Sequence, residues 1–70
     1  MTQQELMDLA RWHEVQADVC HQDYERAIAI AEHESARRAF NLHHFHTKAT
    51  SDLRSLAAAL FNLNCALTNA

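Results

Sequence analysis

Apolar residues between positions 53 and 67 recur at the spacing of a single helix face. They follow one another at intervals of three, four, three and four residues: Leu53, Leu56, Leu60, Leu63 and Leu67. On a helix with 3.6 residues per turn, this spacing forms one narrow stripe. Because an isolated helix of this length is marginal in water, the stripe must pack against the N-terminal part of the chain or against another protein.

The N-terminal part carries a second and longer helical pattern. Thr2 and Glu5 have the spacing of a capping box, so we expect a helix to begin at Gln3. Its expected buried face keeps one phase throughout and comprises Leu6, Ala10, His13, Ala17, Cys20, Tyr24, Ile28, Ala31, Ser35, Ala39 and Leu42. The later members of this face are mostly small, which lets another helix approach closely.

No residue marks the turn between the two patterns sharply. Asn41 is the best candidate, because asparagine tolerates the left-handed conformation that ends many helices, and Arg37 and Arg38 suit a last helical turn. The sequence therefore predicts one domain over residues 1–70, an all-α antiparallel helical hairpin. We expect a first helix at about 3–40, a turn at about 41–44 and a second helix at about 44–69.

These bounds give helices of unequal length. At 1.5 Å per residue the first helix would be about 57 Å long and the second about 39 Å. The first helix would then extend past the second and leave Leu6, Leu9 and Trp12 uncovered at its N-terminal end. A break near residues 21–23 would instead give a three-helix bundle, which we retain as the alternative.

The composition favours helices and limits the size of the core. The 70 residues contain no glycine and no proline, whereas sheet folds need residues of these types in their turns. A single core in so short a chain supplies roughly 3–5 kcal/mol, so we expect help from oligomerisation or a partner. The two cysteines, Cys20 and Cys65, are expected to be reduced, which together with the lack of a signal peptide or an apolar run of membrane-spanning length predicts a cytoplasmic protein.

Charge is distributed unevenly along the chain. Residues 1–34 carry eight acidic and two basic side chains, and residues 35–70 carry one acidic and four basic ones. An antiparallel hairpin would lay the two halves side by side, so the asymmetry favours pairing within the chain. The same charges also suit the helix dipole. The sequence pI of about 6.0 argues against nucleic acid as the main partner of the basic segment.

Six histidines raise the question of a metal site. His43 and His46 could share a helix face, but the HExxH spacing of helical zinc sites is absent, and we interpret the segment as a polar turn and a solvated face. His13 lies on the buried face, where we expect a hydrogen-bonded core residue. His21 points away from Cys20 on a helix and is a poor base for it. We therefore expect no enzymatic activity, no catalytic residues, no metal and no cofactor.

Apolar side chains that the hairpin leaves uncovered are the candidate partner-binding residues. Trp12, Val15 and Val19 form a line beside the buried face, which either broadens the core or forms a docking strip, since tryptophan is enriched at interface anchors. The complete candidate set is Leu6, Leu9, Trp12, Val15, Val19, Leu56, Leu60 and Leu63.

The overall plan resembles that of the small co-chaperones of type III secretion needle subunits. The similarity lies in the short start Met1-Thr2-Gln3, the long polar first helix and the second helix rich in leucine and alanine from Leu53 to Leu67. The resemblance spans the whole chain and implies a partner of the tetratricopeptide type. Together the two would sequester the amphipathic helix of the needle subunit and prevent its premature polymerisation.

The residues themselves predict a helical protein-binding module, and the resemblance makes it a small co-chaperone or adaptor. Its mechanism would be burial of apolar helix faces against a helical partner, without a membrane. The alternative is a homodimeric four-helix bundle with a regulatory or RNA-binding role.

Overall fold

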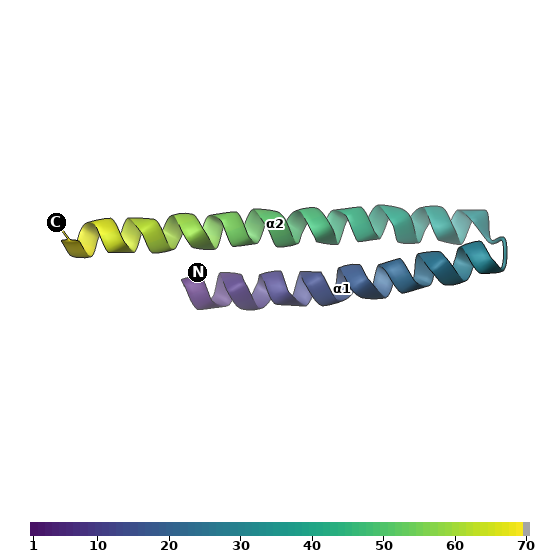
Figure 1. Ribbon diagram of the computed structural model, residues 1–70, viewed down its shortest axis with the longest axis horizontal. Helices are drawn as coiled ribbons and strands as arrows, with labels where there is room; N and C mark the ends of the chain where they lie inside the picture. Colours follow the sequence, from purple (N-terminus) through teal and green to yellow (C-terminus); the bar gives the residue numbers. More distant parts are fainter. Residues whose placement is uncertain (70) are drawn as a thin grey trace.

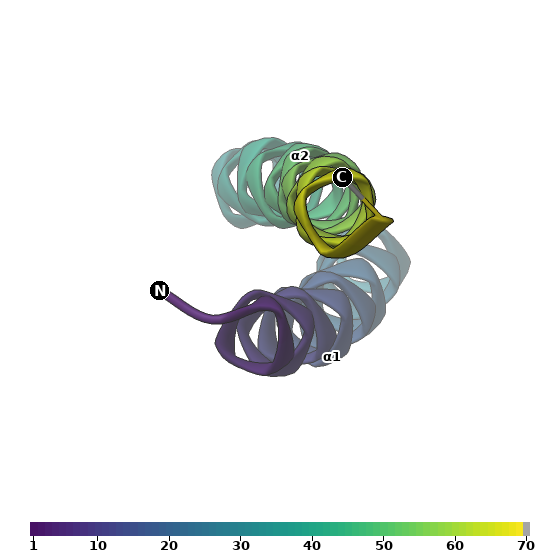
Figure 2. The same cartoon turned by 90° about the vertical axis from the view of Figure 1, so that its left-hand side faces the viewer.

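The computed structural model describes residues 1–69 as two antiparallel helices, with the side chain of Asn69 outside the description. Helix α1 spans Gln3–Ala29 and helix α2 spans His33–Asn69. The hairpin is 59 Å long and about as wide as two packed helices, 14 Å by 13 Å. Figure 1 shows the helices side by side along the length of α1, and Figure 2 shows that they wrap around one another. The predicted all-α hairpin is confirmed.

The N-terminus of α1 is built as the sequence predicts. The backbone N–H of Glu5 donates to the Thr2 hydroxyl at 3.1 Å, and the N–H of Thr2 donates to the Glu5 carboxylate at 3.2 Å. The Thr2 N–H, followed by the Thr2 hydroxyl, holds the pKa of Glu5 below its usual range, because hydrogen bonds to the carboxylate favour its charged form. The capping box thus satisfies donors that an uncapped helix would leave open.

The turn lies at residues 30–32, about ten residues before the predicted position. Ala31 has φ of 57°, the left-handed region, and follows the end of α1. The N–H of Glu32 donates to the Ala27 carbonyl at 2.9 Å, and the N–H of Ala31 donates to the Ile28 carbonyl at 3.1 Å. This pair of bonds is a Schellman motif, in which alanine takes the place usually held by glycine.

The predicted helix bounds of 3–40 and 44–69 are therefore wrong, and no break occurs near residues 21–23. The predicted overhang is also reversed, because α2 is the longer helix. In Figure 1 the C-terminal part of α2 extends past the N-terminus of α1. Leu6, which the prediction left uncovered, is only 4% exposed.

Alanine dominates the contact between the helices. Six of the seven buried apolar residues in the described chain are alanines, and Leu6 is the seventh: Leu6, Ala10, Ala17, Ala27, Ala36, Ala39 and Ala57. Side chains this small allow the helix axes to come close together. A buried methyl group contributes only about 0.8 kcal/mol, against roughly 1.5–3 kcal/mol for a buried leucine or phenylalanine. The core is therefore thin, and most large apolar side chains lie outside it.

Hydrogen bonds between the helices fix their register. His43 donates to the Ala17 carbonyl at 2.9 Å, and His13 bonds His46 at 2.8 Å. The Thr50 hydroxyl shares its proton between the His46 carbonyl of its own helix at 2.9 Å and the Ala10 carbonyl of α1 at 3.4 Å. Counting seven residues from the Ala10–Thr50 contact, backward along α1 and forward along α2, brings Gln3 at the start of α1 opposite Ala57. Residues beyond about 61 form the overhang.

The leucine stripe of α2 divides between the core and the surface. Ala57 is 1% exposed and Leu53 and Leu60 are half-buried, so the helix contact follows these three residues. Leu56, Leu63 and Leu67 are more than half exposed. The hairpin therefore covers only part of the leucine stripe, and the part it leaves open includes Leu56 and Leu63 of the predicted partner-binding set.

Candidate protein-docking face

The two long sides of the hairpin carry different chemistry. One side has a shallow hollow at the turn end, where Asp23 of α1 lies near Arg38 and Leu42 of α2. The other side has hollows along its whole length, the largest of which lies between Asp18 of α1 and Thr47 of α2. These hollows show which residues of each helix share a side.

Residues at helical spacing from the first hollow extend its side into an apolar surface. Steps of three and four residues lead back along α1 from Asp23 to Val19, and along α2 from Leu42 to Phe45. We call this surface the apolar face and define it by its six large apolar residues: Leu9, Trp12, Val19, Leu42, Phe45 and Leu56. All six are exposed, with Trp12 at 52% and Phe45 at 60%. Asp52, which Lys48 bonds, lies among them.

A histidine pair lies in the contact beneath the centre of the apolar face. The Nδ1 atoms of His13 and His46 are 2.8 Å apart, so one ring donates its N–H and the other accepts. The Trp12 ring packs edge-on against His13 and His46, with centroid distances of 5.0 Å and 5.8 Å respectively. The Phe45 ring packs edge-on against the same two histidines, at 6.1 Å from His13 and 5.1 Å from His46. Partial burial lowers the pKa of His46, and the neighbouring His13 lowers it further.

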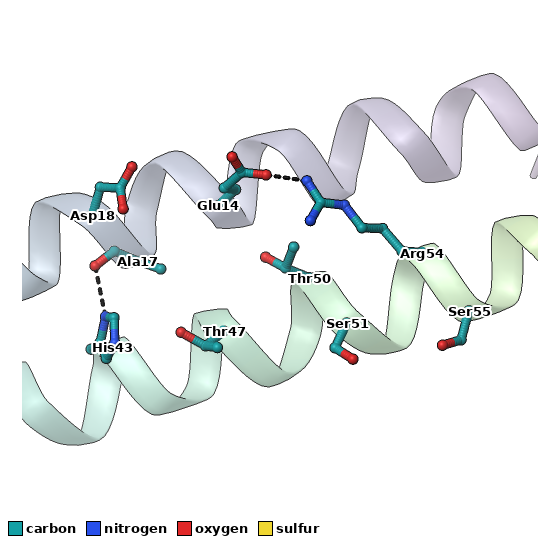
Figure 3. Close-up of a pocket in the computed structure, with 9 residues that line it drawn as sticks. All are labelled: Glu14, Ala17, Asp18, His43, Thr47, Thr50, Ser51, Arg54 and Ser55. Atoms are coloured by element: carbon teal, nitrogen blue, oxygen red, sulfur yellow. Dashed lines mark hydrogen bonds and ion pairs between the residues drawn. The ribbon is translucent and has the colours of Figure 1, made fainter.

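The opposite side of the hairpin, which we call the polar face, is lined mainly by hydroxyl and charged groups. Figure 3 shows its largest hollow, which lies between Glu14 and Asp18 of α1 and Thr47, Ser51 and Arg54 of α2. Glu14 and Arg54 form an ion pair across the two helices. The pair realises the charge complementarity between the two halves of the chain that the sequence predicts.

Histidines also gather near the turn end of the polar face. His21, His43 and His44 line a small hollow together with Tyr24 and Phe40. His21 additionally contacts the carboxylate of Glu25 at 3.0 Å. Within the described residues 1–69, no group of three or more histidine, cysteine or acidic side chains has the geometry to hold a metal ion.

The interpretation of residues 43–46 as a polar turn and a solvated face is wrong, because these residues lie inside α2 and two of the histidines join the helices. His43 and His46 lie three residues apart and face α1, where they bond the Ala17 carbonyl and His13 respectively. His13 is a hydrogen-bonded residue of the helix contact, as predicted. Cys20 and Cys65 are both free thiols.

The structure places the predicted partner-binding residues in different surroundings. Leu9, Trp12, Val19 and Leu56 lie on the apolar face; Leu63 continues that line onto the overhang, and Val15 lies on the outer side of α1 between Trp12 and Val19. Leu60 is half-buried, and Leu6 belongs to the core, so neither offers a full surface. The predicted set does not include Leu42 and Phe45, which also lie on the apolar face. Their spacing with Ala49 and Leu56 is consistent with one line, but the predicted turn covers Leu42 and the predicted second helix begins just before Phe45.

No protein family, curated protein or solved structure was found to match the chain. Among the described residues, no helix combines the length and the apolar character that crossing a membrane requires.

Proposed function

We propose that this chain is a non-enzymatic helical hairpin that binds an amphipathic helix of a partner protein through its apolar face. The observation that carries the proposal is the position of six large apolar side chains from both helices on one side, outside a core made of alanine. Such side chains at helical spacing match the way in which a partner helix is recognised, with anchors every three or four residues.

The size of the apolar face supports this function. From their exposed fractions, the six side chains present roughly 500–600 Å² of apolar surface, which is at the upper end for a monomeric protein. A standard protein interface buries about 800 Å² on each partner. The six side chains alone supply more than half of that area, and the aromatic pair Trp12 and Phe45 would provide its central anchors.

The resemblance to the co-chaperones of type III secretion needle subunits suggests a specific form of this function. In that form the hairpin associates with a tetratricopeptide-type partner, and the two keep a needle-type subunit soluble. Binding would act by mass action, since a partner that binds only the monomeric, folded subunit draws it away from polymerisation.

Co-expression with small helical proteins encoded by neighbouring genes tests the proposal. We expect one of them to become soluble only when the hairpin is present and to copurify with it. Leu56→Asp on the apolar face should abolish this effect, whereas the adjacent Ser55→Asp on the polar side should not. Equal behaviour of the two variants, with both folded by circular dichroism, would refute docking through the apolar face.

A further inference from the structure

The apolar face has a shape that a copy of itself can fit. Its bulkiest residue on α1 is Trp12, and its smallest on α2 is Ala49. The Ala10–Thr50 and His13–His46 contacts place these two residues at nearly the same height along the hairpin. A two-fold axis parallel to the helices would stack two hairpins so that α1 of each copy covers α2 of the other. Trp12 of one copy would then lie over Ala49 of the other.

The same operation brings opposite charges together at the turn end. Asp23 of α1 and Arg38 of α2 border the apolar face on the same hollow and at similar heights. In the stacked arrangement Asp23 of each copy lies over Arg38 of the other, which gives two such pairs. Asp52, the one acid among the face positions of α2 from 42 to 63, is bonded by Lys48 at 2.9 Å, and this bond raises the pKa of the Lys48 amine.

Two further heights along the face also fit. Phe45 falls between Trp12 and Gln16 of the other copy, and Val19 falls against Leu42. Because the interface is isologous, each of these contacts occurs twice. The roughly 500–600 Å² of apolar surface on each copy is more than half of the about 800 Å² that each partner buries in a dimer of standard size.

We infer that a second copy of this chain covers the apolar face, forming an antiparallel four-helix bundle in which α1 of each copy lies on α2 of the other. This inference rests on the face used in the proposed function but not on the identity of the partner. The homodimer is then the state of the chain without a partner, and a partner helix must displace one copy.

Sedimentation equilibrium over about a hundredfold range of concentration tests the inference. We expect dimers with a dissociation constant of roughly micromolar order. Ala49→Trp should weaken the dimer by at least about tenfold, because two tryptophans cannot occupy the space of one. Ala58→Trp, the same change at an exposed position on the other side of α2, should leave it unchanged. Circular dichroism checks that both variants fold.

Disulfide trapping tests the arrangement. Gln16→Cys and Phe45→Cys are placed on two differently tagged chains that lack the native cysteines. A bond between the two tags supports α1 lying on α2 of the other copy. Bonding instead between Ala49→Cys and Leu56→Cys chains would place α2 on α2 and overturn the stated arrangement.

The two proposals fail in different ways. A chain that stays monomeric at every concentration overturns the inference, and the proposed function still stands if Leu56→Asp abolishes solubilisation of a co-expressed partner. A dimer that depends on Ala49 but solubilises no partner leaves the inference standing and removes the proposed function.

Discussion

The two sides of this hairpin are assembled from the same pair of helices and differ in almost every respect. On the polar face, polar groups of the two helices pair with one another, as in the ion pair of Glu14 with Arg54. The apolar face exposes Trp12, Phe45 and Leu56 to solvent although a core lies directly beneath them. The difference shows that the core and the apolar face are separate layers, because the helices meet mainly at alanines and the larger apolar side chains lie outside that contact.

The core layer should be the most sensitive to change. Ala57→Asp places a charge at a position that is 1% exposed, so we expect a loss of more than about 3 kcal/mol, enough to unfold most of a chain of this size. The neighbouring Ala58→Asp, on an exposed position, should change the free energy of unfolding by less than about 0.5 kcal/mol. Thermal unfolding followed by circular dichroism measures both; equal losses would mean that the helices do not meet at Ala57.

The apolar face should respond in binding and not in folding. Leu56→Asp removes an exposed apolar side chain that is 55% accessible, so stability should change by less than about 0.5 kcal/mol while association weakens by at least about tenfold. Ser55→Asp is the matched control. Light scattering measures association for both variants, and a Leu56→Asp chain that associates like the natural one would remove the face from the interface.

Acid should loosen the contact beneath the apolar face. Folding lowers the pKa of His46 below the value of about 6.5 that histidine has in the unfolded chain. Near and below that pH the unfolded chain therefore binds more protons than the folded chain. The free energy of unfolding falls as the pH drops through and below about 6.5. When both His13 and His46 are protonated, neither Nδ1 can accept. The groups facing the pair are the uncharged rings of Trp12 and Phe45.

The midpoint of thermal unfolding, measured between pH 7.5 and 5, tests this dependence. His46→Gln should reduce the slope with pH, while His33→Gln, at an exposed position in the first turn of α2, should retain it. Glu14 and Arg54 form an ion pair across the helices on the polar face, and Glu14→Gln controls for their contribution. An unchanged slope in His46→Gln would exclude the histidine pair as its source.

The polar face should give the smallest effect. Glu14→Gln removes one partner of an ion pair that is open to solvent, so we expect a loss of roughly 0.2–1 kcal/mol that shrinks as salt is added. Urea unfolding at low and high salt measures it. A loss several times larger would show that the polar face contributes as much to folding as the core does.

Much of α1 could be predicted from the sequence because local chemistry determines it. The hydroxyl of Thr2 and the carboxylate of Glu5 define the start of the helix, and the three-four spacing from Leu6 to Tyr24 follows the contact with α2. The hairpin class follows from the absence of glycine and proline together with two helical patterns. His13 was recognised because a lone histidine on a buried face needs a hydrogen-bond partner.

The turn could not be found because nothing in the sequence marks it. Ala31 adopts the left-handed conformation without the glycine or asparagine that usually reports it, and the three-four spacing continues across the reversal of the chain. Asn41 offered a better local signal and is instead an exposed residue inside α2. The tertiary contact, and not local propensity, selects the position of this turn.

The apolar face was only partly predictable for a related reason. Leu53, Leu56, Leu60 and Leu63 form one line by spacing, and only the contact at Ala57 divides them between the core and the surface. Larger residues are usually expected inside, but helices that approach at alanine exclude them. Size on its own therefore does not assign a residue of this chain to the core or to the surface.

The accessibility of Trp12 tests the central claim most directly, because it is the only tryptophan in the chain. Acrylamide quenching of its fluorescence can be measured on the dilute chain, on the concentrated chain and on the chain with a co-expressed partner. We expect strong quenching when dilute and marked protection in at least one of the other two states. A Trp12 that stays equally open to acrylamide in all three would contradict a docking role for the apolar face.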